Sequence, residues 1–403
     1  MKNKKIIIIL VVLVFSIGGI FLINNIYQNK NKINKTKRRK QNNLAIMIKE
    51  EGASGYTKSS SNDMPIGNYV LNEEKTHCEN NGKILSYDNT TGKVKFSFVG
   101  SDRCYLYFDY EEHGIKFETL MIANNTDIFD ENGLRYEGAD PNNYICLDNK
   151  EEGSCSKSTL LFRIIGLFEE EYSNDGTTSS GSKKLLKIID TNNFGLPSWD
   201  ENGTNNWSSA SLKIELNDDY LEALTSTSNV NSKLSNAIAN AKWHLGGAND
   251  DNYNTLTAEG IYTEERNTNA IYSVNPSSIY ARIGLMYPSD YGYATVGGST
   301  TNKSSCRSLA LCNWNYMYDD CKNNNWLFMS QSNFTNDGEW LISPYSSASD
   351  YAAALDSDGS ISLSGLQSVD SFALATRPTF YLDSSVLKIV GGTGTSTDPY
   401  HIG

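Results

Sequence analysis

The sequence predicts an α+β protein in which an N-terminal transmembrane helix precedes a small all-β module and a larger α+β domain. Three observations predict it: an uncharged apolar run near the N-terminus, short alternating strands after it, and helix-capping patterns between strand-rich segments. The chain has 403 residues, more than one ordinary domain needs. We expect a membrane anchor over residues 1–28, a basic stalk over 29–55, the β-module over 56–112, a connector over 113–135 and the α+β domain over 136–403.

The apolar run covers residues 6–23 without a charged side chain, and its apolar character continues to Tyr27. A helix of this length, at about 1.5 Å per residue, matches the hydrocarbon core of a bilayer. A cleaved signal peptide is the alternative, but its apolar region is normally about 7–15 residues long and ends in small residues, whereas Asn24-Asn25 follows here. The sequence therefore predicts a signal-anchor that contacts the lipid bilayer through residues 6–27.

Charge and cysteine usage disagree about the side of the membrane on which the rest of the chain lies. Lys and Arg are more numerous over residues 30–40 than over residues 2–5, which favours a cytoplasmic C-terminal part. The cysteines favour the outside, because none lies in a C-x-x-C or Cys/His metal pattern that a reducing compartment would explain. We expect an extracellular C-terminal part, since long domains cross the membrane largely regardless of flanking charge.

The spacing of the seven cysteines predicts three disulfides, each of which closes a short loop. The expected pairs are Cys78–Cys104, Cys146–Cys155 and Cys306–Cys321. Isolated buried thiols are the alternative for all of them. Cys312 is left over, and we interpret it as a structural thiol rather than a nucleophile, because no His lies near it in the sequence.

Short strands are expected throughout the β-module, over residues 69–71, 83–87, 93–99 and 104–108, with a hairpin turn over 88–92. The α+β domain is expected to have early strands over 144–146, 160–168 and 184–189, helices capped by Ser208 or Ser209, Asn231 and Thr257, and late strands over 279–286, 339–342, 351–355, 360–363 and 379–382. Strands on both sides of a helical middle favour α+β over a wound parallel sheet.

Several segments of the C-terminal part together resemble a family of bacterial surface proteins of unknown function. They cover residues 140–146, 162–166, 283–294, 320–327, 377–378 and 391–394. Members of this family end in a domain with a Trp-Leu-Arg-Ser-Pro segment and a later Gly-Val-Arg-Pro segment. The resemblance extends over about residues 130–403 and implies a C-type-lectin-like domain, similar in layout to the sulfatase-modifying factors. Ile342 stands where the family has Arg, and Ala375-Thr376 stand where it has Gly-Val.

The candidate ligand-binding residues are Trp314, Trp326, Trp340 and Arg377. A tryptophan can line a sugar- or peptide-binding groove, although its more common place is the core. Arg377 matches the family's Arg-Pro segment, and a buried arginine that ties loops together is the alternative to a ligand contact.

Two acidic residues form the one candidate metal site. Asp356 and Asp358 precede Gly359 at alternate positions, as in half of a calcium loop, although a plain hairpin turn explains the same residues. Ca²⁺ is thus the cofactor that the sequence suggests.

Composition limits the possible functions. The formal net charge is -12, and residues 1–40 hold ten Lys or Arg and no acidic residue, so the chain after residue 40 is strongly acidic and we expect no nucleic-acid partner. The four His residues are scattered, and no G-x-S-x-G, H-E-x-x-H or P-loop pattern is present. We expect a membrane-anchored extracellular binding protein, not an enzyme, that recognises a carbohydrate or protein through loops of the C-terminal domain. The alternatives are a cell-wall or surface-glycan enzyme with paired carboxylates and a structural surface component.

Overall fold

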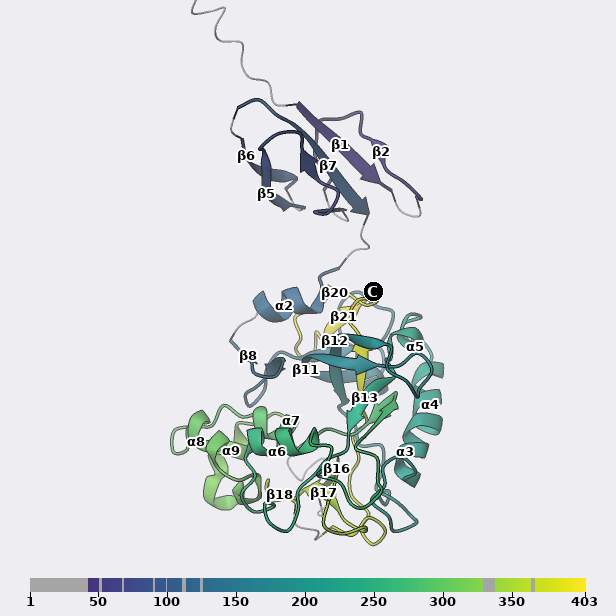
Figure 1. Ribbon diagram of the computed structural model, residues 1–403, viewed down its shortest axis with the longest axis vertical. Helices are drawn as coiled ribbons and strands as arrows, with labels where there is room; N and C mark the ends of the chain where they lie inside the picture. The colour runs from purple at the N-terminus through teal and green to yellow at the C-terminus, as the bar shows by residue number, and fades with distance from the viewer. Residues whose placement is uncertain are drawn as a thin grey trace, which may run out of the picture. The chain divides into compact units, whose positions relative to one another are not determined.

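The computed structural model divides the chain into two compact units, Met1–Glu112 and His113–Gly403 (Figure 1). Each unit has a hydrophobic core of its own. The structure describes residues 43–50, 53–66, 69–89, 91–98, 100–110, 114–123, 126–328, 338–363 and 367–403.

The predicted fold class needs a correction, because an N-terminal transmembrane helix is not supported. Within the described ranges, no helix has the length and apolar character to cross a bilayer. The segment expected to form the signal-anchor, residues 6–27, lies outside the described residues. Even the long helical stretch over residues 211–226 carries Lys213, Glu215 and Asp218, and it is therefore amphipathic. The described chain is a mixture of helices and strands with several sheets.

The N-terminal unit consists of strands from two sheets. The five-stranded sheet contains β1 (Asn43–Lys49), β2 (Thr57–Lys58), β3 (Tyr69–Leu71), β4 (His77–Cys78) and β7 (Arg103–Tyr110), and the second sheet is the hairpin of β5 (Lys83–Asp88) and β6 (Lys93–Ser97). Strand β1 runs parallel to β7, whereas β3 and β4 pair antiparallel with β7.

Alternation of apolar residues explains why this module has a core. Ile46 on β1 and Leu106 and Phe108 on β7 are buried, and Val94 and Phe96 of the hairpin pack against them. Strand β1 corrects the predicted stalk, because it lies within residues 29–55 and belongs to this sheet. Ile46 is buried in the core of the unit and Leu44 and Ile48 are half-buried, and the strand that β1 pairs with, β7, lies about sixty residues further along the chain.

The C-terminal unit is built around an eleven-stranded sheet. Its main path runs β15 (Ile283–Gly284), β19 (Thr379–Asp383), β12 (Gly181–Asp190), β11 (Leu161–Tyr172), β10 (Tyr144–Cys146), β21 (Tyr400–Ile402) and β20 (Ile389–Gly391). Two short pairs extend it, β8 (Ile128–Asp130) with β9 (Leu134–Tyr136), and β13 (Ala241–His244) with β14 (Ser278–Ala281). A separate three-stranded sheet contains β16 (Glu339–Pro344), β17 (Ala352–Leu355) and β18 (Ile361–Ser362).

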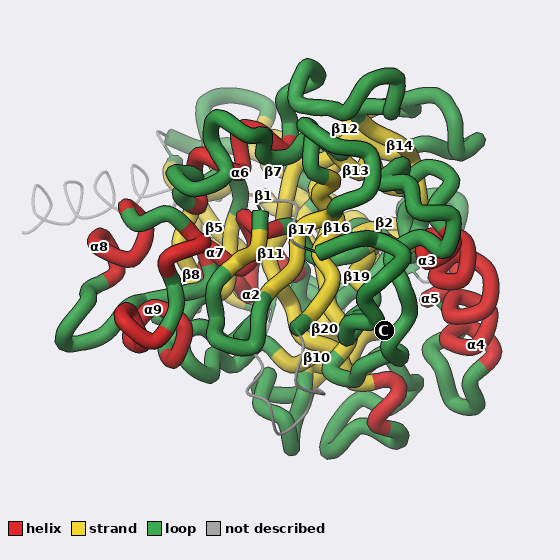
Figure 2. Tube along the Cα trace, turned by 90° about the horizontal axis from the view of Figure 1, so that it is seen from below, coloured by secondary structure: helices red, strands yellow, loops and turns green. Residues whose placement is uncertain are grey.

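Short helices lie on two sides of the strands of this unit (Figure 2). One side has α3 (Ser211–Glu215), the π-helical η2 (Leu216–Tyr220), α4 (Leu221–Ser226) and α5 (Leu234–Ala237). The other has α6 (Ala258–Glu265), α7 (Pro288–Tyr293), α8 (Lys303–Ser308) and α9 (Asp319–Asn323). The 3-10 turns are η1 (Ser158–Leu160), η3 (Leu311–Asn313) and η4 (Tyr316–Tyr318).

The predicted connector, residues 113–135, is part of this unit rather than a linker. It holds α2 (Phe117–Ala123), whose Phe117 and Met121 are buried in the core, and strand β8. Strand β9 begins at the end of this segment, at Leu134, and pairs with β11. Buried apolar residues at positions 117 and 121 are one turn of helix apart, which is why this short helix packs against the sheet.

Candidate functional site

The three candidate tryptophans are core residues. The exposed fractions of Trp314, Trp326 and Trp340 are 0%, 3% and 1%. Each indole N–H donates a hydrogen bond to a backbone carbonyl, those of Cys306, Tyr136 and Pro197, at N–O distances of 3.2, 3.1 and 3.0 Å. Buried indoles with satisfied N–H groups anchor the packing. They offer no surface to a ligand, so their predicted role in binding is wrong.

Arg377 is also buried, and it binds another residue of the chain rather than a ligand. Its guanidinium donates to both carboxylate oxygens of Glu339, at 2.7 Å each, and to the carbonyl of Leu327 at 2.8 Å. Burial raises the pKa of Glu339, and the nearby Arg377 opposes that change. This bidentate pair fixes β16 to the chain before β19.

Asp356 and Asp358 form the turn between β17 and β18. The carboxylate of Asp358 accepts hydrogen bonds from the backbone N–H and the hydroxyl of Ser360, at 2.9 and 2.6 Å. Burial, with a smaller contribution from Asp358, raises the pKa of Asp356 to about 6. In the described part of the chain, the groups of three or more His, Cys, Asp or Glu side chains that lie close enough to share a metal ion are Cys78, Asp102 and Cys104, and Cys146, Asp148 and His401. Asp356 and Asp358 belong to neither group, so Ca²⁺ at this hairpin turn stays a prediction from the sequence.

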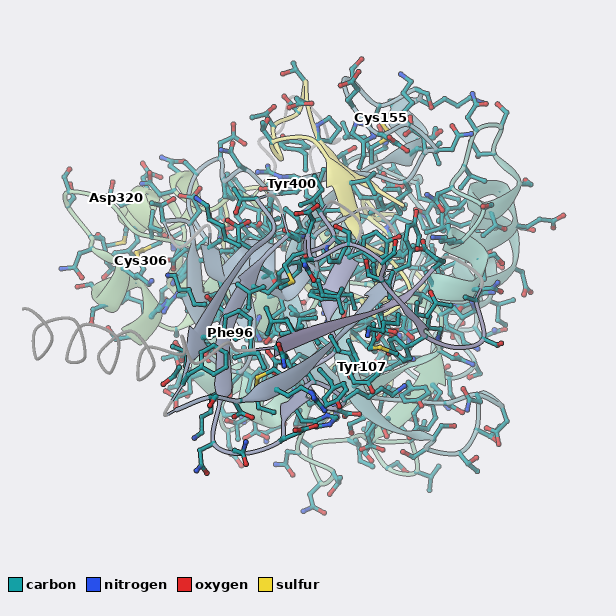
Figure 3. All side chains as sticks on the ribbon, turned by 90° about the horizontal axis from the view of Figure 1, so that it is seen from above. Phe96, Tyr107, Cys155, Cys306, Asp320 and Tyr400 are labelled. Carbon is teal, nitrogen blue, oxygen red and sulfur yellow. A yellow bond between two sulfur atoms is a disulfide. The ribbon has the colours of Figure 1, made fainter. Side chains whose placement is uncertain are left out.

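The structure contains the three disulfides that the cysteine spacing predicts: Cys78–Cys104, Cys146–Cys155 and Cys306–Cys321. Cys155 and Cys306 are labelled in Figure 3. Cys312 is a free, partly buried thiol. Burial raises its pKa, so the thiolate that a nucleophile needs is disfavoured.

Sequence reasoning did not find a group of six charged side chains in the C-terminal unit, which we call the buried ion network. Its members are Arg135, Glu170, Lys187, Glu265, Arg266 and Asp290. Asp290 accepts hydrogen bonds from Lys187 and from Arg135, the latter at 3.2 Å. Burial acts to raise the pKa of Asp290, but these two cations outweigh it and the pKa is lowered.

Glu265 forms the second centre of the network. Its carboxylate accepts from the backbone N–H and the hydroxyl of Ser289, at 2.9 and 2.6 Å, and lies 3.3 Å from the guanidinium of Arg266. Arg266 also contacts Glu170 at 3.3 Å. Burial raises the pKa of Glu265 to about 7. Through its hydrogen bonds to Ser289, Glu265 joins α6 to α7. The side chain is 0% exposed, so it cannot contact a substrate directly.

A hollow of about 450 Å³ lies beside the network, and we call it the acidic hollow. It is lined by residues of α2, α6, β11, β12 and the β8–β9 hairpin. Three carboxylates line it, those of Glu118, Asp130 and Glu169, and Lys184 forms an ion pair with Glu118. The ring of Tyr262 also lines it and lies 3.7 Å from the guanidinium of Arg266. Tyr262 therefore connects the hollow to the network.

A larger groove, of about 640 Å³, lies in the N-terminal unit, and we call it the strand-edge groove. One wall consists of β3 and β4, and the other of β5. Within the described ranges, β3 and β4 pair with β7 alone and β5 pairs with β6 alone, so each strand that lines the groove has one edge without a further strand partner. Sequence reasoning missed it, because nothing in the individual strand patterns indicates which strands come together to line one groove.

Comparison of the chain with protein-family models, with curated proteins and with solved structures finds no match. The resemblance to a bacterial surface-protein family and to C-type-lectin-like domains remains a prediction from the sequence.

Proposed function

We propose that this chain is an exported binding protein that recognises an extended polypeptide segment in the strand-edge groove. The pair of unpaired strand edges on the two walls of the groove carries this proposal. Backbone N–H and C=O groups along such an edge form hydrogen bonds with an added strand, a recurrent mode of peptide recognition.

The side chains of the groove support a peptide ligand. Leu71, Ile84 and Tyr87 are half-buried, pack on the core of the unit and also line the groove. They provide an apolar floor for alternate side chains of a bound strand. Leu85 also lines the groove and is 63% exposed, so its side chain is available to contact a bound segment.

Charged residues at the rim favour a polar flank on the ligand. Glu73, His77 and Lys83 line the groove and are exposed. His77 stacks on the ring of Tyr105, with 5.2 Å between ring centroids, so its position at the rim is fixed. Opposite charges on the two walls select the orientation of a bound segment more than they add affinity.

Export is supported by the three disulfides, because such bonds form and persist in oxidising compartments. The disulfides alone support a location of the chain outside the cytoplasm.

The test uses the full chain and a library of eight-residue peptides with alternating apolar and polar positions. We expect individual peptides to bind, and N-methylation of alternate backbone amides to remove binding, since it removes the hydrogen-bond donors that an added strand needs. Leu85→Lys should weaken binding by about tenfold or more. The matched control is Val274→Lys, at a position of the other unit that is 94% exposed.

Two results would refute strand recognition. One is the absence of any bound peptide in the library, and the other is binding that N-methylation and Leu85→Lys both leave unchanged.

The acidic hollow supports a second candidate, an enzyme that hydrolyses a glycan with paired carboxylates. Asp130 and Glu169 line one cavity, as an acid and a base of such an enzyme would. Incubation with purified peptidoglycan would then release reducing ends, and the Asp130→Asn, Glu169→Gln double variant would not release them. If the chain and the variant release equal amounts, the enzyme candidate is excluded.

A further inference from the structure

A fully buried corner of the C-terminal unit brings together the side chains of Cys146, Asp148 and His401, and we call it the Cys146 corner. Strand β21 runs parallel to β10 with His401 opposite Cys146, and Asp148 follows two residues after the end of β10. The sulfur of Cys146, an oxygen of Asp148 and a ring nitrogen of His401 all lie within 4.8 Å of one another. Cys155, the disulfide partner of Cys146, is partly exposed.

The hydrogen bonds of His401 determine which of its ring nitrogens carries hydrogen. Nε2 lies 2.7 Å from the backbone carbonyl oxygen of Gly153. A carbonyl oxygen only accepts, so Nε2 is the donor. Nδ1 then points into the corner, where it has no hydrogen-bond partner and lies 3.4 Å from a carboxylate oxygen of Asp148. A histidine that ligates a metal commonly shows this arrangement, with its far N–H held by a backbone carbonyl.

Asp148 is oriented in the same way. One of its oxygens accepts from the backbone N–H of Lys150 at 3.0 Å, and the other from that of Ser156 at 2.7 Å. A carboxylate has about four acceptor sites, so these two bonds fix its orientation and leave capacity for a cation. An unpartnered imidazole nitrogen and a fixed carboxylate therefore face the same sulfur atom in the core.

We propose that reduction of the Cys146–Cys155 disulfide converts this corner into a Zn²⁺ site. The four ligands are the thiolates of Cys146 and Cys155, Nδ1 of His401 and the carboxylate of Asp148. Two sulfurs, one imidazole and one carboxylate form a ligand set that zinc accepts in tetrahedral geometry. None of these four ligands lines the strand-edge groove or the acidic hollow, so the zinc site is separate from both.

The chemistry balances with a dithiol as reductant. The dithiol transfers two electrons and two protons to the S–S bond of the protein, which breaks to two thiols, and the dithiol itself closes to a disulfide. Zn²⁺ then displaces the two thiol protons as it binds. The loop of residues 147–154 is thus closed by sulfur in the oxidised state and by metal in the reduced state.

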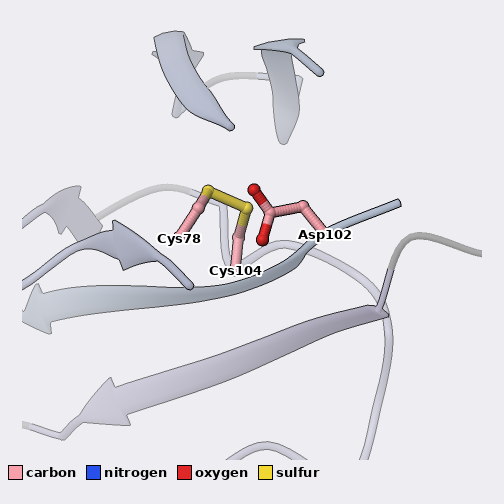
Figure 4. A group of neighbouring side chains, drawn as sticks. All are labelled: Cys78, Asp102 and Cys104. Carbon is pink, nitrogen blue, oxygen red and sulfur yellow. A yellow bond between two sulfur atoms is a disulfide. The ribbon is translucent and has the colours of Figure 1, made fainter. Parts of the chain in front are cut away.

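The Cys78–Cys104 disulfide provides an internal comparison, because Asp102 also lies beside its sulfur atoms (Figure 4). There the carboxylate accepts from the backbone N–H groups of Asn80, Gly82 and Arg103, at 3.0, 2.7 and 2.8 Å. This group contains no imidazole. Reduction of this bond would supply two thiolates without a nitrogen ligand, so we expect it to compete poorly for zinc.

The test uses the full chain, reduced with dithiothreitol under argon and freed of reductant by gel filtration. Titration with Co²⁺ should give one equivalent per chain, with a thiolate charge-transfer band and the visible bands of tetrahedral cobalt, and Zn²⁺ should displace it. The unreduced chain should show neither band. X-ray absorption at the zinc edge should find two sulfur ligands and one imidazole.

Variants assign the ligands. His401→Gln and, separately, Asp148→Asn should each weaken zinc binding, the former by more than about a hundredfold. The Cys78→Ser, Cys104→Ser double variant and Cys312→Ser should retain the full equivalent. A reduced chain that binds no cobalt or zinc overturns the proposal. So does binding that survives His401→Gln and Asp148→Asn but is lost in the Cys78→Ser, Cys104→Ser variant.

Discussion

Replacement of Glu265 by glutamine tests the energetic role of the buried ion network. The carboxyl is fully buried, and burial raises its pKa from 4.5 to about 7. Between these values the folded state binds more protons at this site than the unfolded state does. Stability therefore falls as pH rises from about 4.5 to 7, and the loss is complete above the folded pKa. Once the carboxyl is fully ionised, the loss of unfolding free energy from this site amounts to about 3 kcal/mol.

Glutamine is uncharged at every pH and has nearly the same size, so Glu265→Gln removes this titration. Its amide oxygen still accepts a hydrogen bond from Ser289, which donates through its N–H and its hydroxyl in the parent. We expect the parent to lose about 2.5 kcal/mol of unfolding free energy relative to the variant between pH 5 and pH 8. Other buried acids, such as Asp190 with a pKa raised by burial to about 6, titrate in both proteins and cancel in the difference.

The assay is urea unfolding followed by tryptophan fluorescence at several pH values. All six tryptophans lie in the unit that contains Glu265, so the signal reports that unit. The reasoning would be refuted if the difference in unfolding free energy between parent and variant stayed constant within about 0.5 kcal/mol from pH 5 to pH 8. It would mean that Arg266 keeps this carboxylate ionised in the core at low pH.

Two further predictions concern residues that the sequence selected. Arg377→Met should lower the unfolding free energy by about 3–5 kcal/mol, because it leaves the Glu339 carboxylate buried without its cation. Adding Glu339→Leu to this variant should recover most of the loss in the same urea assay. Equal stability of the single and double variants would contradict this expectation. Cys312 should react with iodoacetamide near neutral pH more slowly than free cysteine does, since burial raises its pKa, and faster labelling in a mass-spectrometric time course would show an activated thiol.

Features set by neighbours along the chain could be predicted from the sequence. Thr257 caps α6, its hydroxyl accepting from the backbone N–H of Gly260, and the four strands predicted over residues 69–108 occur close to their expected positions. The three disulfides follow from short cysteine spacings. By contrast, α3 begins at Ser211 after Ala210, and not after Ser208 or Ser209, because the Ser211 N–H finds its acceptor in Asp200.

Features set by distant partners could not be predicted. Asp290 meets Arg135 and Lys187 across separations of 155 and 103 residues, and no local pattern joins them. The sequence alone places β1 in a stalk, because its partner, β7, lies about sixty residues later in the chain. Exposure of the tryptophans depends on the same long-range packing, which is why residue type alone selected Trp314, Trp326 and Trp340 wrongly as ligand contacts.

The length of the free strand edges determines what the groove can select. Strand β3 has three residues and β4 has two, and the β5–β6 pairing is irregular between Ile84 and Ser86. Short or irregular edges are the means by which proteins avoid indiscriminate pairing. Hydrogen bonds to so few backbone groups cannot hold a strand unaided, so a ligand must also bury side chains against Leu71, Ile84 and Tyr87. Recognition would then depend on the apolar positions of the bound segment, and backbone pairing would set its register.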